Sequence, residues 1–228
     1  MDSFRRYAVY IVPSGALEQF GAGWLGWDIA TGQPAPQPDY AGLPRTLADL
    51  TAVTTPYGLH ATIKPPFRLA DGADQPSLLA AMDKLTGRLP PLTLDGLALT
   101  DLDGFLALTP LGDVTALNAL AADIVRTLDP FRGPATDSEL TRRRAAGLSA
   151  AQEANLQRWG YPYVMDEFGC HITLTGRLTF TEAAQTRAIL APLLAPLPLA
   201  PYPITDLALV GQTQTGRFKL IHRYPLTG

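Results

Sequence analysis

Two of the three histidines in the sequence share one short pattern, a histidine followed two residues later by a threonine. The patterns begin at His60 and His171 and end at Thr62 and Thr173. Attack on a phosphorus centre needs one group that takes a proton from the nucleophile and another that gives a proton to the leaving oxygen. Histidine titrates near neutral pH for both roles. We therefore expect metal-independent phosphoester chemistry with His60 and His171 as the catalytic pair and the threonine hydroxyls as donors to the phosphoryl oxygens.

Alternation of side chains along a strand decides which neighbours share the face of each histidine. A single histidine beside a threonine is more often structural than catalytic, but two matched patterns are harder to dismiss. The same alternation places Lys64 on the face of His60 and Arg177 on the face of His171. Both are candidates for substrate binding, Arg177 at the rim of the site. A solvated lysine is the alternative for Lys64, because Pro65-Pro66 can bend the strand at that point. Tyr7 is a further candidate, because its ring could stack on a base or sugar, and the same holds for Tyr10, Trp159, Tyr161 and Tyr163. Packing in the core is the alternative for most of these rings.

The two patterns head two copies of one unit. Leu97 and Leu207 each open a Leu-Ala-Leu run at nearly the same distance after His60 and His171. In each copy a strand with the histidine leads to a helix and then to a hairpin. The predicted fold is therefore α+β and bilobal, with two antiparallel sheets related by a pseudo-twofold axis, helices packed outside and the cleft between the sheets.

Hydrophobic period and turn residues predict the remaining elements. Strands are predicted near residues 5–12, 59–63, 92–100, 105–109, 170–178, 204–210 and 218–222. Helices are predicted near residues 16–25, 77–89, 114–128, 149–159 and 182–194. Asp113, Ser149 and Thr181 are the expected caps of the last three. Residues 32–44 and 133–147 are predicted loops, the latter carrying a charge run, Arg142 to Arg144, that is either solvated or closes over an anionic substrate.

Composition limits the class of protein. With 228 residues, 46% of them hydrophobic, residues 1–228 are expected to form a single bilobal domain, with the first motif strand near 59–64 and the second near 170–178. A net charge of -3 disfavours duplex nucleic acid but leaves a small phosphoester or a short RNA end open as substrate. No segment offers the roughly 18 apolar residues of a membrane span. We expect a cytoplasmic monomer without a membrane partner.

The single cysteine and the third histidine are expected to be structural. Cys170 alone cannot form an internal disulfide, and a Cys/His zinc cage would lack ligands, so no metal or other cofactor is expected. Cys170 should also point to the face opposite His171 and lie in the core. His222 has no Ser or Thr two residues later and lies in phase with apolar neighbours, which predicts a partly buried structural residue.

The two motifs resemble those of the 2H phosphoesterases, whose mark is a duplicated apolar-His-x-Ser/Thr-apolar sequence. Leu59-His60-Ala61-Thr62-Ile63 and Cys170-His171-Ile172-Thr173-Leu174 both fit it. Four further stretches extend the resemblance to a bacterial branch associated with phosphonate-utilisation operons, the DUF1045-like proteins. They are Tyr7 to Pro13, Gly23-Trp24-Leu25-Gly26, Tyr57 to Phe67 and His222 to Leu226.

The resemblance implies a bilobal α+β fold and attack on cyclic phosphodiesters or related phosphoesters, with the first histidine tending to act as acid and the second as base. A cyclic sugar phosphate from phosphonate breakdown is suggested by operon association alone. Two alternatives stay open. One is a non-catalytic module that binds a phosphorylated ligand in the same cleft, and the other is an enzyme that processes RNA ends or 2′,5′-phosphodiesters.

Overall fold

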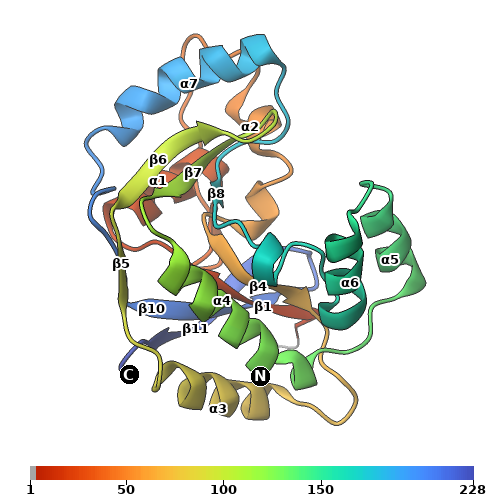
Figure 1. The fold of residues 1–228 in the computed structure, drawn as a ribbon. Coiled ribbons are helices and arrows are strands. Elements are labelled where there is room, and N and C mark those ends of the chain that lie inside the picture. The colour runs from red at the N-terminus through yellow and green to blue at the C-terminus, as the bar shows by residue number, and fades with distance from the viewer. Residues whose placement is uncertain (1–3) are drawn as a thin grey trace.

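The computed structural model describes residues 4–228 as an α+β fold (Figure 1). The strands of its main sheet are β1 (Arg6–Ile11), β4 (Ala61–Phe67), β6 (Gly96–Asp101), β7 (Leu106–Leu111), β8 (Ile172–Thr173), β10 (Asp206–Gln212) and β11 (Phe218–Pro225). They are ordered β11-β10-β1-β4-β8-β7-β6, and every neighbouring pair is antiparallel. Two short ribbons pair β2 (Trp27–Asp28) with β3 (Gln33–Pro34) and β5 (Leu92–Leu94) with β9 (Tyr202–Ile204). The predicted fold class is confirmed.

The two lobes meet at the two motif strands. β4 and β8 pair at one position, Ala61 with Ile172. On one side of this junction the sheet continues through β1, β10 and β11, and on the other through β7 and β6. The two expected sheets are therefore two halves of one sheet. We call them the β4 wing (β11-β10-β1-β4) and the β8 wing (β8-β7-β6), and they join at the His-x-Thr segments.

Each motif strand lies in a wing with the hairpin that follows the other motif. The β6–β7 hairpin follows the first motif in the chain but pairs with β8. The β10–β11 hairpin follows the second motif but belongs, through β1, to the β4 wing. Equivalent strands of the two copies also pair with each other, β4 with β8 and β5 with β9. This exchange of hairpins ties the two copies together and fits a pseudo-twofold relation between them.

Helices pack against the two wings. They are α1 (Ala16–Leu25), α2 (Leu47–Thr51), α3 (Gln75–Thr86), α4 (Thr115–Thr127), α5 (Asp137–Arg144), α6 (Ala150–Trp159) and α7 (Phe180–Leu194), with single 3-10 turns at Thr55–Tyr57, Asp129–Phe131 and Met165–Glu167. Figure 1 shows α7 along the β8 wing, α4 beside β4, and α5 with α6 projecting from one side. α4 buries Leu117, Leu120 and Ile124, the stripe that its sequence predicts. Within the described chain, no helix combines the length and the hydrophobicity that crossing a bilayer requires.

The second motif strand is much shorter than predicted. It was expected over residues 170–178, but β8 ends at Thr173. The backbone N–H groups of Leu174 and Thr175 both donate to the carbonyl of Leu106, and the Leu106 N–H donates to the Thr175 hydroxyl. These bonds turn the chain away from the ladder, so alternation cannot be extended past Thr173.

Two helix starts and one loop also differ from the prediction. α7 is capped by Thr179, not Thr181, because Thr179 and Glu182 form a reciprocal capping box. The N-cap of α4 is Val114, and the Asp113 carboxylate accepts the Thr115 N–H beside it. Residues 133–147 were predicted as a loop but contain α5, which a second capping box starts. Ser149 caps α6 as predicted.

Candidate active site

The four motif side chains form a two-by-two array where β4 meets β8. Each histidine lies one residue before its strand, and each threonine is the second residue of that strand. The middle residues of the two motifs pair with each other and are buried in the core. Antiparallel pairing in this register sets His60 opposite Thr173 and Thr62 opposite His171, with Cβ atoms of opposed residues about 5 Å apart. All four polar side chains therefore share one face of the sheet.

Both imidazoles are held in the same way. His60 Nδ1 lies 2.9 Å from the Gly58 carbonyl oxygen, and His171 Nδ1 lies 2.8 Å from the Gly169 carbonyl oxygen. A carbonyl oxygen only accepts, so each Nδ1 carries a hydrogen and each Nε2 is left for the cleft, where it can accept a proton or, once protonated, give one. The Thr62 hydroxyl lies 3.1 Å from His60 Nε2 and donates to it. Each Nε2 is therefore placed to exchange a proton with a ligand.

Gly58 is required for this arrangement at His60. Its φ of 69° lies in the left-handed region that favours glycine. A Cβ at this position would also lie 2.6 Å from the Cβ of Ile29. The backbone can thus aim the Gly58 carbonyl at His60 only if residue 58 has no side chain.

Aromatic rings pack against both histidines. The Tyr10 ring stacks on the His60 imidazole, with centroids 3.8 Å apart and an angle of 22° between the planes. Phe105 lies 5.9 Å from His171 in a tilted arrangement. Tyr10 is fully buried, and its hydroxyl has no hydrogen-bond partner among residues 4–228. Of the two tyrosines of β1 that were considered for stacking, Tyr10 lies on the face of the array, because alternation places it opposite Tyr7.

The environment of His60 favours its neutral form. Burial lowers the pKa of His60 to about 4, the Gly58 carbonyl opposes this change, and the charge of nearby His171 adds to it. His60 is therefore unprotonated at neutral pH and can accept a proton.

A cavity of about 410 Å³ opens over this array and is lined by His60, Thr62 and Thr173. A smaller cavity of about 120 Å³ lies beside it and is lined by His171. Thr62, Pro65 and Tyr161 line both cavities, so the two spaces adjoin at the centre of the array. The larger volume is typical of a site for a small molecule.

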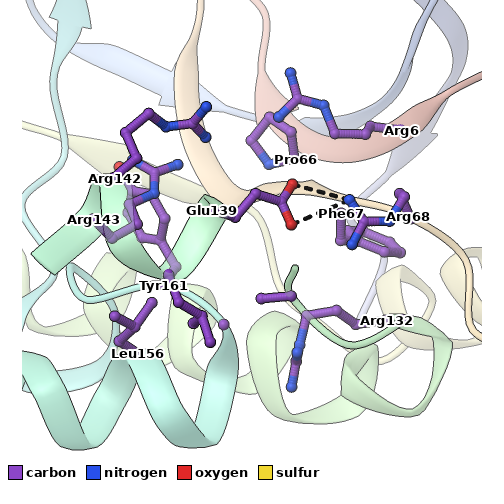
Figure 2. A pocket seen from close by; sticks show the side chains of 14 residues that line it. Arg6, Pro66, Phe67, Arg68, Arg132, Glu139, Arg142, Arg143, Leu156 and Tyr161 are labelled. Atoms are coloured by element: carbon purple, nitrogen blue, oxygen red, sulfur yellow. Dashed lines mark hydrogen bonds and ion pairs between the residues drawn. The ribbon is translucent and has the colours of Figure 1, made fainter. Parts of the chain in front are cut away.

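Arginines surround the mouth of the larger cavity. Arg6, Arg142 and Arg143 line it, and they also line a neighbouring pocket with Arg68 and Arg132 (Figure 2). Among the described residues that line that neighbouring pocket, Glu139 alone has a carboxylate, and it pairs with Arg68 at 3.0 Å. The charge run at 142–144 is thus divided: two of its arginines face the site, while Arg144 pairs with Glu153 at 2.7 Å.

The predicted position of Lys64 is wrong. Its side chain is buried, and Nζ donates to the Val125 carbonyl at 3.2 Å and lies 3.9 Å from Asp129. The register between β1 and β4 shifts twice near Lys64, which marks a bulge. A bulge inserts one residue into the alternation, so Lys64 points to the opposite side of the sheet from Thr62.

Replacing Lys64 with methionine is expected to remove a pH dependence of stability. Burial lowers the pKa of Lys64 from 10.5 to about 8, while Asp129 opposes this change. Between these pH values the unfolded chain holds a proton that the folded chain has lost, so the contribution of Lys64 to the free energy of unfolding should rise with pH by about 3 kcal/mol, whereas the raised pKa of Cys170 acts in the opposite direction. Urea titrations at pH 7.5 and 10 measure most of this rise. The difference in the free energy of unfolding between native protein and Lys64→Met should change by this amount between the two pH values, whereas the difference between native protein and the exposed control Lys84→Met should stay constant; equal changes in both variants would contradict this account.

Tyr7 and Arg177 were also predicted at the site, and the structure places both elsewhere. Tyr7 is a core residue, and its hydroxyl donates to the Gln75 side chain at 3.2 Å. Arg177 follows the end of β8 and reaches the Asp103 carbonyl at 3.4 Å. Neither residue lines the cavities that contain the histidines.

The remaining candidate groups do not join the array. Burial raises the pKa of the Cys170 thiol to about 12, which makes it a poor nucleophile. His222 was predicted to be partly buried but is exposed on β11, where a second register shift changes the alternation. Among the described residues, no group of three or more His, Cys, Asp or Glu side chains is placed to hold a metal ion.

Comparison with known proteins identifies relatives of the chain. The profile of the family described as "Protein of unknown function (DUF1045)" matches residues 62–219. A protein of Janthinobacterium sp. (strain Marseille), "Ribose 1,5-bisphosphate phosphokinase PhnN", is 40% identical over 185 residues, which cover 80% of this chain and 41% of that protein. The protein of the same name from Laribacter hongkongensis (strain HLHK9) is 37% identical over 175 residues, covering 76% and 40%. The chain thus spans about two fifths of the length of these relatives.

Solved structures align along the length of the chain. The alignment with a Thermus thermophilus protein covers 98% of this chain and 98% of that protein, with 15% sequence identity and a TM-score of 0.45. The alignment with E. coli LigT in complex with 3′-AMP covers 99% of this chain and 100% of LigT, with 16% sequence identity and a TM-score of 0.44.

Proposed function

The chain belongs to the DUF1045 family, and we propose that it is a metal-independent phosphoesterase that opens a cyclic phosphodiester, or a related phosphoester, of a small molecule. The observation that carries this proposal is the two-by-two array, in which two imidazoles and two hydroxyls share one face of the sheet and line two adjoining cavities, with each Nδ1 held by a backbone carbonyl. Binding alone does not need two imidazoles in one array, whereas acid-base catalysis needs one group that accepts a proton and another that gives one.

In the proposed reaction His60 is the base and His171 the acid. His60 Nε2 takes a proton from water, the water oxygen forms a bond to phosphorus, and the bond from phosphorus to one ring oxygen breaks. His171 gives its proton to that oxygen, so the products are a hydroxyl and a phosphomonoester. The Thr62 hydroxyl turns from His60 Nε2 to the substrate, and Thr62 and Thr173 then donate to the non-bridging oxygens, whose negative charge grows during the attack. The lowered pKa of His60 supports this order, which is the reverse of the one implied by resemblance to the 2H phosphoesterases.

The assignment of His60 as base predicts its titration. In the free protein the His60 ring should titrate near pH 4, below the ordinary value of 6.5, because burial disfavours its charged form. Proton NMR of the histidine C–H resonances measures this value, with His60→Ala identifying the signal. Inorganic phosphate should raise the value, since an anion in the cavity stabilises imidazolium. A His60 titration near pH 6.5 in the free protein would contradict the assignment.

The two sequence relatives are named as kinases. We attribute their kinase activity to the part of those proteins that this chain does not span. A common phosphate-binding loop of nucleotide-dependent enzymes places a lysine directly after a glycine. None of the three lysines of this chain follows a glycine. Ribose 1,5-bisphosphate, which the name gives as the kinase substrate, is a sugar phosphomonoester. Opening a cyclic phosphodiester on ribose yields a compound of that class, so ribose-based cyclic phosphodiesters are the first substrates to test.

A hydrolysis screen in EDTA tests the proposal. It should include cyclic ribose phosphates, cyclic nucleotides and 2′,5′-linked dinucleotides. Turnover of a cyclic ribose phosphate is the expected result. Turnover of the dinucleotides alone would replace the proposed substrate class with RNA-type phosphodiesters, and saturable binding without product would favour a binding module.

A further inference from the structure

Three arginines at the mouth of the cavity lack carboxylate partners. Arg6, Arg142 and Arg143 line the cavity that contains His60, and none of them forms an ion pair with a carboxylate of residues 4–228. Like charges gathered at one opening repel each other, and an anion between them would remove that cost.

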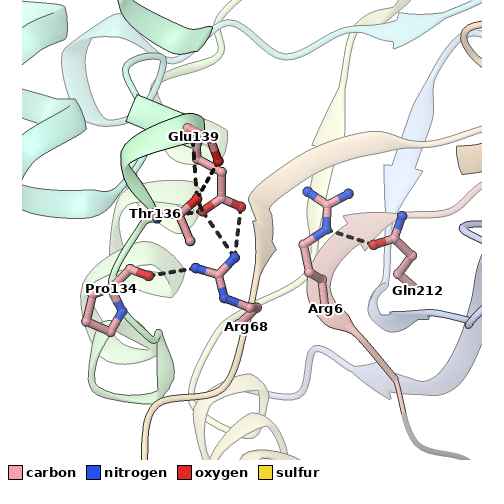
Figure 3. A network of polar contacts seen from close by, with 7 residues as sticks. Arg6, Arg68, Pro134, Thr136, Glu139 and Gln212 are labelled. Carbon is pink, nitrogen blue, oxygen red and sulfur yellow. Dashed lines mark hydrogen bonds and ion pairs between the residues drawn. The ribbon is translucent and has the colours of Figure 1, made fainter. Parts of the chain in front are cut away.

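The guanidinium groups are aimed at a common space. Figure 2 shows those of Arg6 and Arg142 pointing toward each other across the pocket. Gln212 holds Arg6, accepting from its Nε at 2.8 Å (Figure 3). Arg143 lies over the Tyr161 ring, 4.4 Å from its centroid. Arg6 and Arg143 are thereby held by neutral partners, which leave their charge uncompensated.

Tyr10 provides an independent indication of a ligand. Its side chain is fully buried, it lines the same cavity, and its hydroxyl is unpartnered among the described residues. A buried hydroxyl without a partner costs free energy, which a hydrogen bond to a bound ligand would recover. Burial raises the pKa of Tyr10 well above its ordinary value, so the group remains a donor. Three cations and a neutral donor together suit a phosphate group.

The helix that carries two of the arginines is fixed to the body of the protein. Arg68 on the chain after β4 binds Glu139 of α5 at 3.0 Å and the Pro134 carbonyl at 2.7 Å (Figure 3). Burial alone would raise the pKa of Glu139, but the Thr136 N–H and Arg68 outweigh it and lower the pKa to about 2. Glu139 is therefore charged at neutral pH and keeps its ion pair with Arg68. This ion pair holds α5 with Arg142 and Arg143 toward the cavity.

We propose that Arg6, Arg142, Arg143 and the Tyr10 hydroxyl form a subsite for a second phosphate of the substrate, distinct from the phosphorus attacked between His60 and His171. The inference rests on the proposed function. It narrows the substrate class to cyclic phosphodiesters of a sugar that carry a phosphomonoester at another position. Such a group has nearly two negative charges and three acceptor oxygens, which match the planar forks of arginine.

Two cyclic ribose phosphates that differ only by a phosphate on the 5-oxygen provide the kinetic test. Native protein should prefer the 5-phosphorylated compound by about 10- to 100-fold in kcat/KM, the range expected for hydrogen bonds between charged groups. Arg142→Gln should lower kcat/KM about 10-fold for that compound and leave the other unchanged. The neighbouring Arg144→Gln, which removes a charge directed away from the cavity, should alter neither. Equal losses on both compounds in Arg142→Gln would overturn the subsite, because the arginine would then serve the attacked phosphate.

Ligand binding separates failure of the subsite from failure of the proposed function. Ribose 5-phosphate, titrated by calorimetry, should bind native protein and His171→Ala equally, and Arg142→Gln about 10-fold more weakly. Circular dichroism confirms that each variant is folded. Binding that depends on Arg142, with no cyclic compound hydrolysed, would leave the subsite standing and remove the phosphoesterase. Equal binding to all three proteins would overturn the subsite whatever the turnover.

Discussion

Replacement of His60 or of His171 by alanine is expected to lower kcat/KM for a cyclic phosphodiester by about 10³-fold, within the range for a positioned acid or base. Each variant removes one proton carrier: His60→Ala leaves the attacking water without a base, and His171→Ala leaves the departing oxygen without an acid. Initial rates in EDTA, followed by phosphorus NMR, measure the loss. The double variant should fall little below the single ones, because the two groups act in one step.

His222 supplies the matched control for both histidine variants. It is the third histidine of the chain and is exposed on β11, away from the cavities that contain His60 and His171. His222→Ala should therefore keep native activity. Native rates in either His60→Ala or His171→Ala would show that the array does not perform the chemistry.

Replacing Thr62 or Thr173 with valine is expected to lower kcat about 100-fold with little change in KM. Valine has nearly the shape of threonine but cannot donate a hydrogen bond, and loss of one donor to a developing negative charge costs about 10²- to 10³-fold. The effect falls on kcat because the charge grows mainly in the transition state. Steady-state kinetics of the two variants separate kcat from KM.

Serine at the same positions is the control for this loss. Thr62→Ser and Thr173→Ser keep the hydroxyl and should recover most of the activity. An increase in KM alone in the valine variants would mean that the hydroxyls bind the substrate without stabilising the transition state. Serine variants as slow as the valine variants would show that packing, and not hydrogen bonding, is lost.

The candidate array was predictable from sequence because it depends on local periodicity and duplication. Two His-x-Thr segments, each the start of a similar unit, identify four residues, and alternation puts each histidine beside its own threonine. The sequence could not show that β4 pairs with β8 through one residue of each. That register, which places His60 against Thr173, is a tertiary contact between segments far apart in the chain.

The second-tier predictions failed where alternation itself breaks. A bulge turns Lys64 into the core, and the early end of β8 carries Arg177 away from His171. Pro65 and Pro66, directly after Lys64, indicate an irregular strand there, but the side to which Lys64 points and the end of β8 depend on how neighbouring strands pair. Tyr7 and Tyr10 lie on opposite faces of β1, and composition alone does not tell which face meets the cavity.

The arginines of α5 illustrate a third limit. A run of three arginines in a polar segment is most simply a solvated surface, and only the packing of α5 shows that Arg142 and Arg143 reach the cavity while Arg144 pairs outward. Their position also bears on the direction of the reaction. The array is nearly symmetric, but the arginines line the cavity of His60 and not that of His171. A second phosphate bound there would fix the substrate in one orientation and so give the two histidines different roles.

The most direct test of the two-histidine mechanism is phosphorus NMR of a cyclic ribose phosphate incubated in EDTA with native protein and, in parallel, with the folded His60→Ala/His171→Ala double variant. The proposed mechanism predicts conversion of the cyclic signal to that of a phosphomonoester by native protein alone. Conversion at equal rates by both proteins, or activity of the native protein that EDTA abolishes, would contradict it.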